Sequence, residues 1–341
     1  MADGGAFGLS RVATSHTIDC GGDLKLRLSV AVPLDKRGPP SFVIYVLDPE
    51  PELFALVTAH LFGRFGYVSS ENDPEASLMR RAAVVGVGHD PSLYNAGAYG
   101  FSVEALRDLR RKHFRDDIGG FMEILIDTVV PYSEATVLGM ADVVPRQRAL
   151  LGCSLSSLLA LRTVLRPEQP FGQFICGSPS LIFTPQLIDD ARKACRKKTP
   201  TPARLLIVVG ALEARLKADG GNGIPQASEY TAGVLRRGGH RVEPMVVVGG
   251  ESHDSLKPSL VSRGIGWLEQ CWGDEESGDG EAAAVEQSGE PPADETAIER
   301  ETQTLTSSAL GVGDIPWSTV SALVAVLAAG VVAGWCLRAR R

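Results

Sequence analysis

Continuous apolar runs constrain the fold of this chain more than any other feature. Residues 41–47 (Ser-Phe-Val-Ile-Tyr-Val-Leu) and 82–87 (Ala-Ala-Val-Val-Gly-Val) contain almost no polar side chain, which is typical of strands buried on both faces. Further short runs occupy 173–176, 204–209 and 242–248, and helical spacing occurs between strands, for example over 53–65 and 119–130. Strands that alternate with helices predict a mainly parallel central sheet with helices on both faces. Residues 24–32 alternate apolar and polar, which predicts a half-exposed antiparallel strand.

The stretch 149–161 joins a short apolar strand to a Leu- and Ala-rich helix through a tight turn that contains Ser154. This is the arrangement of a nucleophile elbow, in which a serine stands at the top of a strained strand-to-helix turn. Small residues are needed beside such a serine because strand and helix approach closely, and Gly152 and Ser156 occupy those positions. We therefore predict Ser154 as a nucleophile, with the backbone N–H of Leu155 at the helix start as an oxyanion donor.

A serine nucleophile needs a general base, and the chain contains six histidines. In parallel sheets, functional residues lie beyond the carboxyl ends of the strands. His253 follows the strand at 242–248 and should lie at that edge, whereas His240 precedes the same strand. Hydrolases with this elbow have the chain order Ser, acid, His, and four histidines precede Ser154, namely His16, His60, His89 and His113. We predict His253 as the base.

The acid that orients the base should leave the preceding strand at its carboxyl end. That strand is the run at 204–209, and Glu213 follows it directly. Glu213 is therefore the predicted partner that orients His253 and stabilises the imidazolium. Asp219 and Asp254 remain open as alternatives.

Over most of residues 15–270, the chain resembles the esterase family of α/β-hydrolases that includes enterochelin (ferric siderophore) esterases. The resemblance rests on the order and spacing of Val43-Ile-Tyr-Val-Leu-Asp48, Val84-Val-Gly-Val-Gly88, Gly152-Cys-Ser-Leu-Ser156, Cys176-Gly-Ser-Pro-Ser180, Val209-Gly-Ala-Leu-Glu213 and Glu251-Ser-His253. It implies an α/β-hydrolase fold, Ser154 as nucleophile, His253 as base and a small-molecule ester as substrate. Glu213 falls where the family often carries Gly-x-x-Glu.

The chain departs from the family's pattern at two places. Ser156-Ser157 stands where members usually have a pair of glycines, and Pro49 stands where they usually have glycine. Proline has no backbone N–H, so a second oxyanion donor from that loop would have to come from Glu50 or a neighbour. Two alternatives to a carboxylic-ester hydrolase stay open: a catalytically inactive fold acting as a membrane-anchored binding module, and an acyltransferase.

The C-terminal segment 315–337 contains no charged residue and is about as long as the ~20 residues that span a membrane. Trp317 and Trp335 lie near its two ends, where amphipathic rings prefer the interface. We expect a single transmembrane helix that is inserted after synthesis and leaves the large domain in the cytosol, on the mitochondrial outer or peroxisomal membrane rather than the endoplasmic reticulum. Gly330 and Gly334 have the spacing of a close helix–helix contact, which suggests a homodimer formed through this segment.

Charge divides the remainder of the chain. Between residues 273 and 314 there are 12 acidic residues and one basic residue, with few large apolar ones, which predicts a disordered acidic linker. The organisation we expect is an N-terminal arm (1–14), an esterase-like domain (15–272), the linker (273–314), the transmembrane helix (315–337) and a basic tail (338–341). Residues 1–272 are close to neutral, which argues against nucleic acid as a partner. The six cysteines form no C-x-x-C pair, so neither a metal nor a cofactor is predicted.

Overall fold

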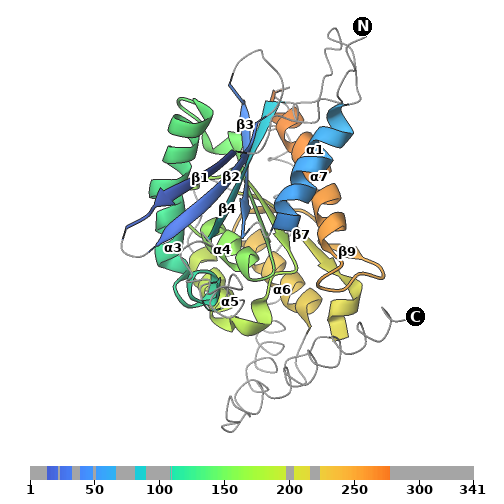
Figure 1. Ribbon diagram of the computed structural model, residues 1–341. Helices are drawn as coiled ribbons and strands as arrows, with labels where there is room; N and C mark the ends of the chain where they lie inside the picture. Colours follow the sequence, from blue (N-terminus) through green and yellow to red (C-terminus); the bar gives the residue numbers. More distant parts are fainter. Residues whose placement is uncertain are drawn as a thin grey trace, which may run out of the picture. The chain divides into compact units, whose positions relative to one another are not determined.

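The structure is a computed structural model (Figure 1) and describes residues 14–21, 24–32, 39–48, 51–66, 81–89, 108, 110–196, 203–215 and 223–276. The strands in this part of the chain are β1 (Thr14–Asp19), β2 (Lys25–Ala31), β3 (Phe42–Leu47), β4 (Ala82–His89), β5 (Arg148–Cys153), β6 (Gln173–Gly177), β7 (Arg204–Gly210), β8 (Arg241–Val242) and β9 (Val246–Val248). The longer helices are α1 (Pro51–Gly66), α3 (Ile118–Ile124), α4 (Leu155–Val164), α5 (Pro185–Cys195), α6 (Ile224–Arg237) and α7 (Lys257–Glu276).

All nine of these strands belong to one sheet, in the order β1-β2-β4-β3-β5-β6-β7-β8, with β9 also paired to β7. The pairs β1–β2 and β2–β4 are antiparallel, whereas every pair from β4 onward is parallel. The prediction of a mainly parallel sheet with an antiparallel strand at 24–32 is therefore confirmed. Because β5, β6 and β7 are parallel neighbours, the segments that follow them emerge at the same edge of the sheet.

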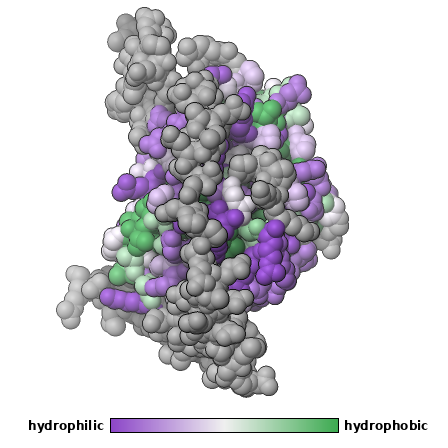
Figure 2. All heavy atoms as spheres, turned by 180° about the vertical axis from the view of Figure 1, so that it is seen from behind, coloured by the Kyte–Doolittle hydropathy of each residue, from purple (hydrophilic) through white to green (hydrophobic). Residues whose placement is uncertain are grey.

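Alternation along β3 divides the core into two layers. Val43 and Tyr45 pack into one hydrophobic cluster, and Ile44 and Val46 pack into the other. The first cluster includes side chains of α3, α4, α5 and α6, and the second includes side chains of α1 and α7. Helices therefore cover both faces, as expected, and α1 and α7 lie side by side on one of them (Figure 1). Seen from behind, the described surface is largely hydrophilic, with hydrophobic side chains in small separate patches (Figure 2).

Two expected elements differ from the structure. The single strand expected at 242–248 is divided into β8 and β9, because Pro244 lies between them and has no N–H to donate to a sheet. The single helix expected at 119–130 begins as α3 and continues through the wider π-type turns of η4 (Leu125–Val129). In addition, β1 extends the sheet where no strand was predicted. The sequence pattern did not indicate this strand because Ile18 is its one buried residue.

The boundary expected at residue 272 falls within helix α7. Helix α7 continues through Glu276, and Cys271 and Trp272 within it are buried in the core, so the helix carries beyond the position where acidic composition begins. Among the described residues, no helix combines the length and the apolar character needed to cross a membrane. The expected arm up to Ala13, most of the linker, the predicted transmembrane segment with Gly330 and Gly334, and the basic tail lie outside the described residues.

Candidate active site

Ser154 lies at the junction between β5 and α4 in a conformation that L-residues rarely adopt. Its φ is 61° and its ψ −120°, and helix α4 begins at the next residue. Backbone strain of this kind, which costs of order 1–3 kcal/mol, concentrates at functional sites. A Cβ atom at Gly152 would lie 2.6 Å from the backbone oxygen of Ser156, so only glycine fits there. The strand-to-helix turn predicted from the sequence is therefore present.

The side chains of Ser156 and Ser157 are accommodated inside the elbow. Ser156 Oγ accepts a hydrogen bond from Cys153 N–H at 2.9 Å, and it lies 2.9 Å from the oxygen of Cys153. Ser157 Oγ can donate to the carbonyl oxygens of Gly152 (2.8 Å) and Gly177 (2.9 Å). Both side chains are buried. Their hydroxyls therefore hold the turn together rather than preventing it.

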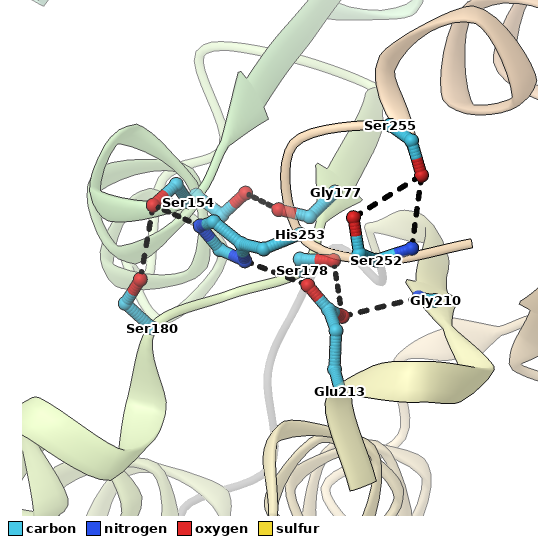
Figure 3. A network of polar contacts seen from close by, with 10 residues as sticks. Ser154, Gly177, Ser178, Ser180, Gly210, Glu213, Ser252, His253 and Ser255 are labelled. Atoms are coloured by element: carbon cyan, nitrogen blue, oxygen red, sulfur yellow. Dashed lines mark hydrogen bonds and ion pairs between the residues drawn. The ribbon is translucent and has the colours of Figure 1, made fainter. Parts of the chain in front are cut away.

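Three side chains from separate segments of the chain form a continuous chain of hydrogen bonds (Figure 3). Ser154 Oγ lies 2.8 Å from Nε2 of His253, and Nδ1 of the same ring lies 2.6 Å from Oε1 of Glu213. Because a carboxylate can only accept, this network assigns the ring proton to Nδ1 and leaves Nε2 to accept from the serine. The residues predicted as nucleophile, base and acid thus lie in the geometry of a catalytic triad.

Glu213 is fully buried, and its second oxygen is also satisfied. Oε2 accepts from Ser178 Oγ at 2.6 Å and from the N–H of Gly210 at 3.0 Å. Burial by itself raises the pKa of this carboxyl, but the hydrogen bonds from His253, Ser178 and Gly210 outweigh it and hold the pKa below its usual value. Glu213 is therefore a carboxylate across the neutral range, as a residue that stabilises an imidazolium must be.

The other candidates do not occupy this network. Asp254 is exposed on the loop beside His253, and Asp219 lies outside the described residues. His240 accepts from Ala203 N–H at 3.3 Å, and His89 and His113 hydrogen-bond each other at 2.7 Å. His16 lies on β1 and His60 on α1. Among the described histidines, only His253 has a hydrogen bond to Ser154 in this structure.

Two site residues were not predicted from the sequence. Ser178 contacts Glu213, and Ser180 Oγ lies 3.2 Å from Oγ of Ser154. Both belong to the Cys176-Gly-Ser-Pro-Ser180 stretch, which contributed to the resemblance without a role being assigned to it. Its position after β6, between the strands that carry the nucleophile and the acid, was the available signal.

The oxyanion donors are placed only in part. Leu155 is the first residue of α4, so its N–H has no acceptor within the helix and is available at the site. Pro49 and Glu50 lie outside the described residues, so the second predicted donor stays a prediction.

A similarity to siderophore esterases emerges from comparison with known proteins. The ferri-bacillibactin esterase BesA of Bacillus subtilis (strain 168) is 31% identical over 123 residues, which is 35% of this chain and 42% of the relative. The chain thus matches less than half of the length of this curated relative. No model of a protein family matches.

Solved structures support the fold over a much larger part of the chain. The siderophore hydrolase EstB of Aspergillus nidulans superimposes with a TM-score of 0.58 at 18% identity and covers 78% of this chain and 96% of its own. The siderophore hydrolase EstA of the same organism gives 0.56 at 18%, with 79% and 98% covered. The BES protein of Bacillus cereus gives 0.54 at 16%, with 80% and 98% covered. The domain therefore shares its fold, a mixed α/β sheet of the α/β-hydrolase type, with these three proteins.

Proposed function

We propose that this chain is a serine hydrolase that cleaves carboxylic esters through an acyl-enzyme intermediate. The observation that carries the proposal is the unbroken chain from Ser154 through His253 to the buried carboxylate of Glu213. It is supported by the similarity to a bacterial siderophore esterase and by the shared fold.

In the proposed reaction, Ser154 Oγ attacks the ester carbonyl while its proton passes to Nε2 of His253. Glu213 stabilises the imidazolium through Nδ1–H, and the N–H of Leu155 donates to the oxyanion. The imidazolium then protonates the departing alcohol. Water, deprotonated by the same ring, releases the acid in a second half-reaction. His253 is 28% exposed, so water can reach it without the carboxylate behind it being solvated.

The substrate class follows from the relatives alone. They are named for ferri-bacillibactin and for siderophores, so we propose an ester bond in a siderophore-like molecule as the first substrate to test. The alternatives are an acyltransferase, in which an alcohol or amine replaces water, and a binding module without turnover.

Hydrolysis of an ester panel tests this proposal. We expect the full chain to cleave at least one member of a set containing a catecholate trilactone, an ester-linked hydroxamate and simple p-nitrophenyl esters, with product release followed by chromatography. Ser154→Ala should not cleave that member. Transfer of the acyl group to added glycerol or an amine in preference to water would contradict hydrolysis and support the acyltransferase alternative. Binding of a siderophore without turnover of any ester by wild type would favour the binding module.

We also propose that residues 315–337 tether the domain to a membrane as a C-terminal anchor, with the domain in the cytosol. The support is the uncharged segment with a tryptophan near each end. Deleting residues 315–341 should move the protein from the membrane pellet to the supernatant while leaving the unfolding transition of the domain unchanged. Folded truncated protein that still pellets from a detergent-free lysate would contradict the anchor.

A further inference from the structure

The loop formed by residues 178–180, which follows β6, contacts both ends of the triad (Figure 3). Ser178 Oγ donates to Oε2 of Glu213 at 2.6 Å, and Ser180 Oγ lies 3.2 Å from Oγ of Ser154. Ser178 is 0% exposed and Ser180 2%. Two buried hydroxyls therefore contact the acid and the nucleophile from one short loop.

A backbone hydrogen bond joins each serine to the element that carries its partner in the triad. Ser178 N–H donates to the oxygen of Val208 in β7, the strand from which Glu213 follows. Its φ of 40° is unusual for a residue other than glycine, and such strain persists where the surroundings require it. The side chain of Ser178 is thereby directed at a carboxylate, and a hydrogen bond to a charged acceptor is stronger than one between neutral groups.

Ser180 is tied to the nucleophile in the same way. Its N–H donates to the carbonyl oxygen of Ser154 at 3.4 Å. The hydroxyl of Ser154 donates to His253, so its oxygen is left to accept from the hydroxyl of Ser180. This second contact restrains the rotation of the Ser154 side chain and keeps its proton directed at Nε2.

We propose that Ser178 and Ser180 are positioning residues for ester hydrolysis: Ser178 holds Glu213 against His253, and Ser180 holds Ser154 in its reactive rotamer. This inference rests on the proposed function and names two residues that it does not use. Neither serine passes a proton to the substrate, so each acts through a member of the triad.

Kinetics of the full chain test Ser178. Ser178→Ala should lower kcat about tenfold or more with KM unchanged, because the lost contact supports the transition state rather than substrate binding. Its hydrogen bond lowers the pKa of Glu213, so its removal should raise the pKa of that carboxyl, which carbon-13 NMR of the side-chain carboxyl measures. In a Glu213→Gln background the same replacement should cost little. Additive losses and an unchanged pKa of Glu213 would show a merely structural residue.

Reaction with a fluorophosphonate tests the role of Ser180. The probe reacts with the Ser154 hydroxyl but does not make the binding contacts of an ester substrate. Ser180→Ala should lower kcat and the rate of phosphonylation by a similar factor of about 3–10 with KM unchanged, and Ser180→Thr should recover most of both. The matched control is Ser228→Ala, because Ser228 is a buried serine of α6 whose hydroxyl has no partner among the described residues. A change in KM alone would assign Ser180 to substrate binding and overturn the proposal.

A readout without turnover separates this inference from the proposed function. The Nδ1–H of His253 should give a far-downfield proton resonance that His253→Ala abolishes. Ser178→Ala should shift or broaden it, whereas Ser180→Ala and Ser228→Ala should not. If wild type proves inert to esters and probe, the proposed function fails and the role of Ser180 fails with it. The resonance still decides Ser178: a shift supports its role and an unchanged resonance overturns it.

Discussion

Replacing either Ser154 or His253 by alanine is expected to lower ester turnover by about 10³-fold or more, and replacing both should be hardly worse than replacing one. The physical reason is that the two side chains act as a unit, joined by the 2.8 Å contact between Oγ and Nε2. A base without its nucleophile has no proton to accept, and a nucleophile without its base stays a weakly reactive alcohol. The measurement is kcat/KM on the best ester of the panel for wild type, both single variants and the double variant.

Glu213→Gln should cost less than either alanine variant, because a serine–histidine pair with a poorly oriented ring keeps part of its activity. The matched control is Asp254→Asn, which alters an exposed carboxylate beside the same histidine and should leave turnover unchanged. Losses for Ser154→Ala and His253→Ala that multiply in the double variant would contradict the triad, since they would show two independent contributions.

Replacing Glu134 by alanine is expected to lower the free energy of unfolding by about 3–5 kcal/mol, the range for removing one partner of a buried ion pair. Glu134 receives two hydrogen bonds from Arg148, at 2.6 and 2.7 Å, and a third from the hydroxyl of Tyr45 at 3.0 Å. The side chain of Glu134 is 7% exposed and that of Arg148 15%. The variant would leave the guanidinium largely desolvated without a counter-charge. Chemical denaturation of the full chain measures the loss.

A surface ion pair provides the control for this second prediction. Arg162 and Asp190 are joined at 2.8 Å but are 37% and 30% exposed, so Asp190→Ala should cost less than about 1 kcal/mol. Glu134→Gln keeps an acceptor for Tyr45 and Arg148. Its loss in the free energy of unfolding should therefore lie between the losses for Glu134→Ala and Asp190→Ala, which gives a measurable variant if Glu134→Ala does not fold. Equal losses for Glu134→Ala and Asp190→Ala would contradict the account.

The parts of the fold that were predictable from the sequence are the strands buried on both faces, because their sequences are continuously apolar. β3 and β4 are buried along nearly their whole length and were predicted within two residues of their ends. β1 was missed because edge position exposes most of its side chains and leaves Ile18 as its one buried residue. The division of β8 from β9 could have been read from Pro244, which interrupts the run that predicted one strand.

The candidate site shows the same distinction between local and distant information. Ser154, His253 and Glu213 were identified because each follows a strand, and parallel strands bring their carboxyl ends together. Ser178 and Ser180 were missed because their roles depend on side-chain contacts across neighbouring strands, which no local pattern specifies. The substitution of serines for glycines at 156 and 157 raised the possibility of an inactive elbow. Their buried hydrogen bonds within the turn show that the elbow forms with them.

If Ser154 is an activated nucleophile, it should react covalently with an electrophilic probe. A fluorophosphonate should modify wild-type protein at one site, and peptide mapping by mass spectrometry should place the adduct on Ser154. Ser154→Ala should stay unlabelled, and His253→Ala should react much more slowly because the hydroxyl has lost the base that lies 2.8 Å away. Folded wild type that stays unlabelled, or that is labelled equally with and without Ser154, would contradict the account.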